Sequence, residues 1–228
     1  MIIYGKQVCL YALKKHTRLI KTVYIVKRGI LPKELYIQYK SSIKFLENRL
    51  AQSMAKGGNH QGVLVEMEDF SQSNLAVMKQ YQFILVLDFI TDTGNIGAIV
   101  RSAYALGVDG IIATGIKSLN FASIARTSSG ALLDMPFAII PNILDVLNEL
   151  KQVKFKIYGA DIDGKALGLC KFEKRKVLVL GSEGDGISKR VKPKIDEMVS
   201  IEMERDFNSL NVSVATGILI YRMKNETK

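Results

Sequence analysis

Three polar segments of this 228-residue chain each follow an apolar run, and each holds side chains that could orient a substrate. The segments are 91–101, 180–187 and 203–217. Their candidate catalytic side chains are Asn95, Arg101, Glu183, Ser209 and Asn211. Three glycines around Glu183 allow the backbone to approach a ligand closely or to adopt positive φ. Because ligands of open parallel sheets bind beyond the carboxyl ends of the strands, the three segments together predict an enzyme site.

Each segment also has a simpler explanation. Arg101 fits a surface arginine on an amphipathic helix, and Glu183 fits a solvated residue of a tight turn. The stretch 208–217 mixes the alternation of a strand with the spacing of a helix, which fits a terminal helix capped by Ser and Asn. The second segment has neither the glycine spacing of a dinucleotide fingerprint nor the Lys-Ser/Thr ending of a P-loop. The combination of the three segments, and not any one of them, favours an enzyme.

Histidine and cysteine are too sparse to support other kinds of catalysis. His16 and His60 belong to no cluster, and Cys9 and Cys170 are far apart along the chain. The sequence therefore offers neither a nucleophile–base pair for acyl transfer nor a ligand set for a metal ion. The two cysteines are typical of reduced thiols in a cytoplasmic protein.

The elements that must position these side chains alternate between strand and helix from residue 81 onward. The predicted strands are 83–88, 108–113, 137–140, 155–160, 176–180 and 199–202. The predicted helices are 96–106 and 142–150, a short one within 119–135, and a C-terminal one after residue 210. Asn95 is expected to cap the first of these helices. This alternation predicts an α/β fold with a mostly parallel sheet and helices on both faces.

Residues 1–67 predict a separate small α/β module, joined by a polar linker, 68–80, to a second domain, 81–228. Within the module we expect helices over 6–13, 32–39 and 45–54 and strands over 22–26 and 62–67. The net charge of the chain is +10, and the 12 Lys and Arg residues of 1–56 face only two acidic residues. The rest of the chain is neutral, which favours a nucleic acid held by the module and chemistry in the second domain.

No segment predicts a membrane span or a signal peptide. The best apolar run, 83–87, ends at Asp88, and the first residues lack the basic-then-apolar design of a leader. A membrane surface is a weaker candidate than RNA for the basic module, because no basic amphipathic helix stands out.

Three ordered motifs resemble the SpoU (TrmH-like) branch of the SPOUT RNA methyltransferases. They are Asn95–Ala103, Leu180–Gly186 and the pair Ile201–Met203 with Ser209–Ala215. The N-terminal module resembles, more weakly, the ribosomal-protein-like RNA-binding domain of the members that act on 23S rRNA, through Tyr4-Gly5 and His60–Val63. The resemblance implies an α/β knot, in which the C-terminal segment forms a deep trefoil knot, and it implies a homodimer.

The resemblance further implies transfer of a methyl group from S-adenosylmethionine to a ribose 2′-hydroxyl of RNA. The positions expected to bind the methyl donor are Gly181, Ile201, Met203 and Leu210. The positions associated with activity are Asn95, Arg101, Glu183, Ser209 and Asn211. Thr93 departs from the family, in which many members have proline there. Because a guanidinium essentially never loses its proton, we expect Arg101 to hold a phosphate and stabilise the developing alkoxide instead of acting as a literal base.

A guanosine of 23S rRNA is the favoured substrate, and three alternatives remain at this point. A tRNA 2′-O-methyltransferase is the main rival, although basic extensions flanking the knot would suit it better than a separate N-terminal module. A non-catalytic ribosome- or RNA-binding protein is the rival of another class, against which Arg101, Glu183 and Asn211 argue together. A redox enzyme with a doubly wound sheet is the least favoured, because the glycine fingerprint is absent.

Overall fold

The computed structural model of the chain describes residues 1–182, 184–205 and 209–226. They divide into two compact units: unit 1 comprises Met1–Ser71 and Asn120–Asp134, and unit 2 comprises Gln72–Leu119 and Met135–Lys228. The sequence places 120–134 in the second domain, whereas here this segment groups with the N-terminal residues. The predicted linker, 68–80, contains the end of one unit, the start of the other and a short helix, α4 (Leu75–Met78).

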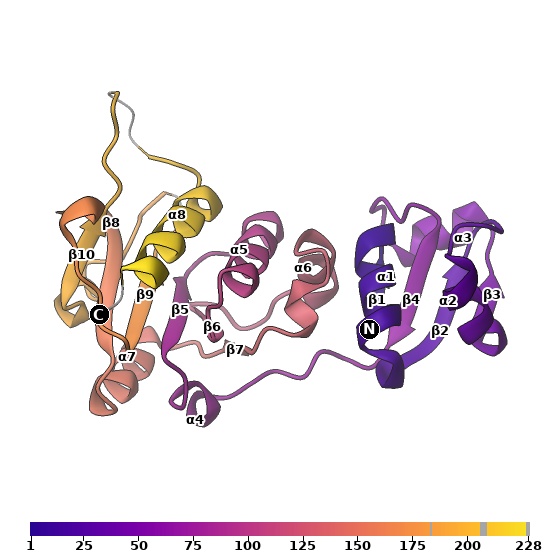
Figure 1. Ribbon diagram of the computed structural model, residues 1–228, viewed down its shortest axis with the longest axis horizontal. Coiled ribbons are helices and arrows are strands. Elements are labelled where there is room, and N and C mark those ends of the chain that lie inside the picture. Colours follow the sequence, from indigo (N-terminus) through magenta and orange to yellow (C-terminus); the bar gives the residue numbers. More distant parts are fainter. Residues whose placement is uncertain (183, 206–208, 227–228) are drawn as a thin grey trace. The chain divides into compact units, whose positions relative to one another are not determined.

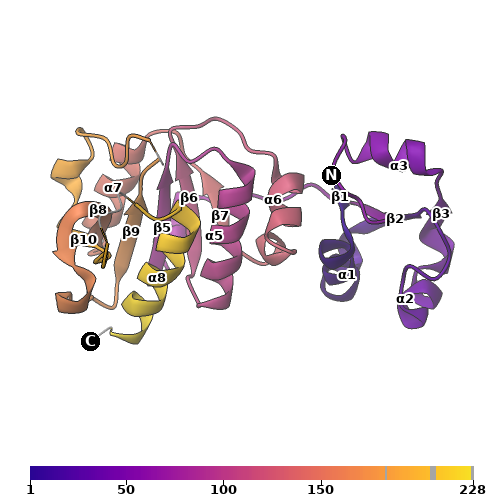
Figure 2. The ribbon, with the colours of Figure 1, turned by 90° about the horizontal axis from the view of Figure 1, so that it is seen from above.

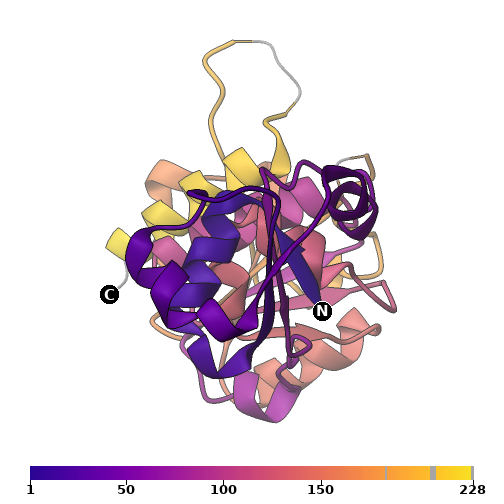
Figure 3. The same ribbon diagram turned by 90° about the vertical axis from the view of Figure 1, so that its right-hand side faces the viewer.

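Unit 1 is built on a four-stranded mixed sheet whose strand order is β1-β4-β2-β3. Its strands are β1 (Ile2–Tyr4), β2 (Ile20–Ile25), β3 (Ile43–Phe45) and β4 (Val63–Met67). Its helices are α1 (Lys6–Lys15), α2 (Lys33–Gln38), α3 (Asn48–Met54) and α6 (Phe121–Thr127). Helices α1 and α2 lie on one face of the sheet and α3 on the other, as Figures 2 and 3 show.

Two edge strands of this unit were not predicted, and one expected helix is shorter than predicted. The expected helix over 45–54 begins only at Asn48, in α3, and Phe45 instead ends the edge strand β3. Residues 43–45 pair in parallel with β2, since Ile43 lies opposite Val23 and Phe45 opposite Ile25, and this pairing satisfies backbone groups that a helix would have used internally. The edge strand β1 was not predicted, because three residues are too few to show a periodicity.

Unit 2 contains a six-stranded sheet in the order β10-β8-β9-β5-β6-β7, in which every neighbouring pair is parallel. Its strands are β5 (Phe83–Asp88), β6 (Gly110–Thr114), β7 (Phe137–Ile139), β8 (Lys156–Ala166), β9 (Lys176–Leu180) and β10 (Glu197–Ser200). Its longer helices are α5 (Thr93–Ala105), α7 (Ile143–Gln152) and α8 (Val212–Asn225). The predicted α/β class with a parallel sheet is therefore confirmed (Figure 1).

Helices cover both faces of this sheet, with α5 and α8 on one face and α7 on the other (Figure 2). The α7 face is built from alternating strand residues such as Ile84, Val86 and Val179, which pack with Val146 and Leu150 of the helix. All six residues of β5 are buried, as the continuous apolar run of that strand predicts. Burial on both faces fixes the central strands, so the segments that follow them have a rigid base.

Short single-turn helices complete both units. They are Thr17–Leu19, Lys40–Ser42, Ala131–Leu133, Leu167–Leu169 and Lys192–Lys194. Within the described residues, no helix has both the length and the apolar character that crossing a membrane requires.

Candidate active site

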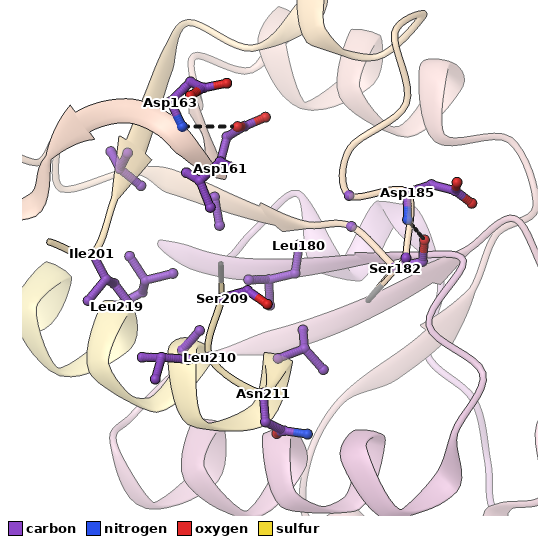
Figure 4. Close-up of a pocket in the computed structure, with 18 of the residues that line it drawn as sticks. Asp161, Asp163, Leu180, Ser182, Asp185, Ile201, Ser209, Leu210, Asn211 and Leu219 are labelled. Carbon is purple, nitrogen blue, oxygen red and sulfur yellow. Dashed lines mark hydrogen bonds between the residues drawn. The ribbon is translucent and has the colours of Figure 1, made fainter. Parts of the chain in front are cut away.

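A pocket of about 770 Å3 opens at the carboxyl ends of β9 and β10 and beside the middle of β8. One side of it is apolar and includes Leu180, Ile201, Met203, Leu210 and Leu219. Its polar lining comprises Asp161, Asp163, Ser182, Asp185, Lys192, Ser209 and Asn211. Figure 4 shows Ile201, Leu210 and Leu219 together on one side, with the aspartates and Ser182 around the rest of the opening. This volume lies within the ~300–1,000 Å3 typical of sites for small organic ligands.

The turn after β9 crosses itself at Gly181, and this crossing shapes the floor of the pocket. A Cβ atom on Gly181 would lie 2.1 Å from the carbonyl carbon of Gly186 and 2.4 Å from the backbone nitrogen of Ile187. Ser182 and Gly186 form a backbone bridge, and Gly186 has a positive φ of 61°. No larger residue fits at Gly181 without moving backbone, so both glycines are required by the turn itself.

The segment Ser209-Leu210-Asn211 lines the pocket and leads into α8, which begins at Val212. Asn211 caps this helix, because its Oδ1 accepts hydrogen bonds from the backbone nitrogen of Ser213 at 2.9 Å and from its hydroxyl at 2.6 Å. Helix caps of this kind contribute about 1 kcal/mol. The mixed pattern of the sequence thus has two causes, a pocket-lining strand-like entry and a helix start.

Asn211 also joins α8 to α5. Its Nδ2 donates a hydrogen bond of 3.0 Å to Oδ1 of Asn95, although the two residues lie 116 positions apart. Asn95 was expected to cap α5, and this expectation was wrong: Asp92 is the cap, because the helix begins three residues earlier than predicted. The carboxylate of Asp92 accepts the backbone N–H of Asn95 at 2.7 Å, which leaves the Asn95 side chain available to Asn211. The amide pair therefore holds two helix N-termini beside the pocket.

The other candidate residues differ in whether they line the pocket. Gly181, Ile201, Met203, Ser209, Leu210 and Asn211 line the pocket, and Asn95 reaches it through Asn211. Arg101 lies two turns further along α5, is exposed to solvent, and is not among the pocket-lining residues. Glu183 lies outside the described residues.

Sequence reasoning missed the acidic side of the pocket, which the middle of β8 provides. Asp161 pairs with Nζ of Lys192 at 2.7 Å and accepts the backbone N–H of Asp163 at 3.2 Å. The hydrogen bond from Lys192 is the main cause that lowers the pKa of Asp161, so this carboxylate stays ionised. The signal was present, since an Asp-x-Asp-Gly sequence follows the buried first part of this strand, but it matched no known motif. No group of three or more His, Cys, Asp or Glu side chains in the described part of the chain is arranged to hold a metal ion.

This geometry suits an elongated organic ligand with an apolar, flat part and a charged part. The apolar wall and the glycine floor can enclose the flat part, while the carboxylates can attract a positive group. The paired helix N-termini bring backbone and side-chain amides to the edge of the pocket, where they can orient a second, polar reactant. Such an arrangement supports a transfer between a bound small molecule and a larger substrate.

Comparison with known proteins adds two family-model matches. The model described as the SpoU rRNA Methylase family matches residues 82–221, and the model described as RNA 2′-O ribose methyltransferase substrate binding matches residues 2–73. The chain is 32% identical over 192 residues to the 23S rRNA (guanosine-2′-O-)-methyltransferase RlmB of Haemophilus ducreyi, which covers 80% of this chain and 78% of that protein. It is 39% identical over 150 residues to an uncharacterized tRNA/rRNA methyltransferase of Borreliella burgdorferi, covering 65% of this chain and 66% of that protein.

Solved structures share the fold over nearly the whole chain. The crystal structure of an AdoMet-bound rRNA methyltransferase from Sinorhizobium meliloti aligns with a TM-score of 0.80 at 21% identity, covering 98% of this chain and 86% of that one. At this identity the likeness concerns the fold alone.

Proposed function

The chain belongs to the SpoU rRNA methylase family, and we propose that it transfers a methyl group from S-adenosylmethionine to the 2′-hydroxyl of a guanosine ribose in 23S rRNA. The observation that carries this proposal is the pocket beside the parallel strands. Residues of the second and third sequence motifs line it, and Asn95 of the first motif is hydrogen-bonded to the lining residue Asn211. RNA 2′-O-methylation is the activity of the family, while the nucleotide is inferred from the relatives named for 23S rRNA.

The residues present fit S-adenosylmethionine. Gly181 presents only backbone to the pocket, and Ile201, Met203 and Leu210 supply apolar surface for the adenosine. The ionised Asp161, with Asp163 and Asp185, gives the pocket negative charge suited to the amino and sulfonium groups of the donor. When bound, the donor supplies an already activated methyl group.

The chain must then align the ribose and help its hydroxyl to lose a proton. Asn95 and Asn211 orient the ribose or the loops that hold it, and Ser209 orients the pocket edge. Arg101 holds the neighbouring phosphate and stabilises the developing alkoxide, with the proton leaving to phosphate or water, because a guanidinium is not an available base. Glu183 fixes Arg101 or a group of a second subunit. Alignment of this kind can lower the barrier by several kcal/mol.

Two further family features complete the proposal. The C-terminal part of the chain, which ends in α8, forms a deep trefoil knot. The protein is a homodimer in the cytoplasm. In support of the dimer, Val214, Ile218 and Tyr221 are 52%, 40% and 63% exposed and recur on one stripe of α8 at helical spacing.

RNA is held mainly through the basic residues of 1–56. This range holds 12 Lys and Arg and two acidic residues, and the difference accounts for the net charge of +10 of the chain. This charge separation supports a large structured RNA in which a contact site lies apart from the methylated nucleotide. The relatives named for 23S rRNA favour the ribosomal substrate over tRNA.

Titration with the donor and a transfer assay together test the proposal. The purified protein should bind S-adenosylmethionine and move a labelled methyl group onto protein-free 23S rRNA, and alkaline digestion should leave the label in a 2′-O-methylguanosine dinucleotide. Label found only in transfer RNA would redirect the assignment to the tRNA alternative. Failure to bind the donor would favour the non-catalytic RNA-binding alternative.

A further inference from the structure

Unit 1 exposes one large aromatic ring to solvent, that of Phe45 at the end of the edge strand β3. The side chain is 51% exposed, and it is the only aromatic among the exposed large apolar residues of unit 1, all of whose residues are described. The core cluster beneath α3 includes the neighbouring Leu46 but not Phe45. The fold therefore does not use this ring for packing, although an exposed phenylalanine is costly in water.

A cation accompanies the ring. The guanidinium of Arg28, in the loop after β2, lies 5.9 Å from the centre of the Phe45 ring, within the range of a cation–π contact. Parallel pairing of β3 with β2 brings this loop to the end of β3, since Phe45 lies opposite Ile25. The exposed surface thus presents two planar groups, one aromatic and one guanidinium, next to each other.

Three further cations lie close to this pair in the sequence. Lys27, Lys44 and Arg49 are all exposed, and none of them, nor Arg28, forms an ion pair with any residue in the described part of the chain. Uncommitted cations beside an exposed ring match the two needs of single-stranded RNA, which are neutralisation of phosphates and a surface for an unstacked base. A protein partner would instead favour a wider apolar patch with fewer charges.

We propose that Phe45 and Arg28 form a stacking platform for an unpaired base of the RNA substrate, with Lys27, Lys44 and Arg49 holding the adjoining phosphates. This inference rests on the proposed function for the identity of the RNA, and it adds the part of the substrate that unit 1 reads: a single-stranded loop or bulge. A duplex cannot offer a base to the ring without unpairing it.

The chain contains no tryptophan, which allows a direct optical test. In Phe45→Trp the single indole should stack on a base, so its fluorescence should be quenched when a short single-stranded RNA oligonucleotide is added. A duplex RNA of the same length should quench it much less. Ile37→Trp is the matched control, because Ile37 is 62% exposed on α2 of the same unit and has no role in the platform. Equal quenching of both variants, or of Phe45→Trp by both RNAs, would overturn the proposal.

Binding measurements separate stacking from charge. Phe45→Ala should weaken binding of the single-stranded oligonucleotide by roughly 5- to 100-fold at every salt concentration, without changing the slope of log affinity against log salt. Lys44→Gln should reduce that slope by about one phosphate contact. Ile37→Ala should change neither quantity. Unchanged affinity in Phe45→Ala, or a change in oligomeric mass in its place, would show that the ring serves another purpose.

The same samples distinguish failure of this inference from failure of the proposed function. Donor binding and methyl transfer by the wild-type protein test the function, whereas the oligonucleotide experiments need neither donor nor turnover. A wild-type protein that methylates 23S rRNA while Phe45→Ala binds and methylates equally well would remove the platform and leave the function. Quenching of Phe45→Trp by single-stranded RNA, in a protein that binds no donor, would support the platform and contradict the proposed function.

Discussion

Asn211 has two separable structural tasks beside the pocket. Its Oδ1 caps α8 through Ser213, and its Nδ2 reaches Asn95 on α5. The motif in the sequence identifies the residue as important, but it does not separate these tasks, since the Asn95 contact joins segments that only the fold brings together. The expected cap role of Asn95 was wrong for the same reason: Asp92, three residues earlier, is an equally good cap by sequence, and only the backbone decides between them.

Substitutions at Asn211 should separate the cap from the bridge. Asn211→Ala loses both and should lower the free energy of unfolding by about 1–2 kcal/mol, while Asn95→Ala, which keeps its Asp92 cap, should lower it less. Asn211→Asp retains the cap acceptor but cannot donate to Asn95, so it should fold well and transfer methyl poorly. Urea unfolding and a transfer assay measure both effects. Full additivity of the two alanine substitutions in the double variant would contradict a shared bond.

Substitution of Arg101 should affect methyl transfer and not donor binding. Because it lies outside the pocket lining, Arg101→Ala should leave S-adenosylmethionine binding nearly intact. Loss of alkoxide stabilisation should reduce transfer by ~10²-fold or more. Arg101→Lys keeps the charge without the planar fork and should recover only part of the rate. Calorimetry of donor binding beside single-turnover transfer gives the comparison, and near-normal turnover by Arg101→Ala would refute the assigned role.

At the scale of elements, the buried β5 and β9 were predictable because their continuous apolar runs have no other stable place in a parallel sheet. Strand β9 was predicted with its observed limits, Lys176–Leu180. The edges were less predictable, since edge strands depend on tertiary pairing more than on pattern. Strand β3 was not predicted, and its last residue, Phe45, was assigned to a helix, while β10 lies two residues earlier than expected. The acidic residues of β8 show the same limit. Asp161 and Asp163 lie within this strand, where its pairing with β10 is interrupted between Gly159 and Lys165, and the sequence pattern does not show such an irregularity.

Lys176 links β9 to the end of α8 and gives a pH prediction. Its Nζ donates to the carbonyl oxygen of Met223 at 2.9 Å, and its side chain is 2% exposed. Burial, together with the charge of Lys224, lowers the pKa of Lys176 to about 8 from an ordinary 10.5. Between these values the unfolded chain holds a proton that the folded chain has released. The free energy of unfolding contributed by Lys176 therefore increases as the pH rises from about 8 to 10.5, and it decreases as the pH falls through the same range.

Comparison with Lys176→Met isolates this contribution from other titrating groups. At pH 7 the variant avoids burying a charge, so its free energy of unfolding should exceed that of the wild type. This difference should shrink by on the order of 2–3 kcal/mol as the pH is raised from about 8 to 10.5. Lys154→Met, which removes an exposed lysine, is the control and should show no such trend. Urea unfolding at a series of pH values supplies the measurement. A stability difference between Lys176→Met and wild type that does not vary with pH would contradict the depressed pKa.

At the scale of the whole molecule, the uneven charge was the most useful feature of the sequence. It separated a basic N-terminal part, 1–56, from a neutral remainder before any element was placed, and it led to the proposal that RNA binding and catalysis belong to different parts of the chain. What the sequence could not give was the composition of the two compact units, because residues 120–134 join unit 1 from within the second half of the chain. Side chains of this segment, such as Ile124 and Leu132, are fully buried. The local sequence pattern predicts that they are apolar, but it does not predict which other segments they pack against.

Charged residues on the exposed stripe of α8 should dissociate the proposed homodimer. Ile218→Glu combined with Tyr221→Glu places two charges on the exposed stripe of α8 and should halve the mass measured by analytical ultracentrifugation. Val77→Glu, on the exposed side of α4, is the control and should leave the mass unchanged. A wild-type protein that sediments as a monomer would contradict the dimer, as would a charged double variant that keeps the wild-type mass.

The central claim is that this chain methylates a guanosine ribose of 23S rRNA, and mapping of 2′-O-methyl groups in cellular RNA tests it most directly. Total ribosomal and transfer RNA would be compared from cells that carry the gene, cells that lack it, and cells in which the wild-type or the Arg101→Ala chain is restored. The account predicts that one guanosine of 23S rRNA loses its methyl group without the gene and regains it only with the wild-type chain. A methyl group lost from transfer RNA while 23S rRNA stays unchanged, or full restoration by Arg101→Ala, would contradict it.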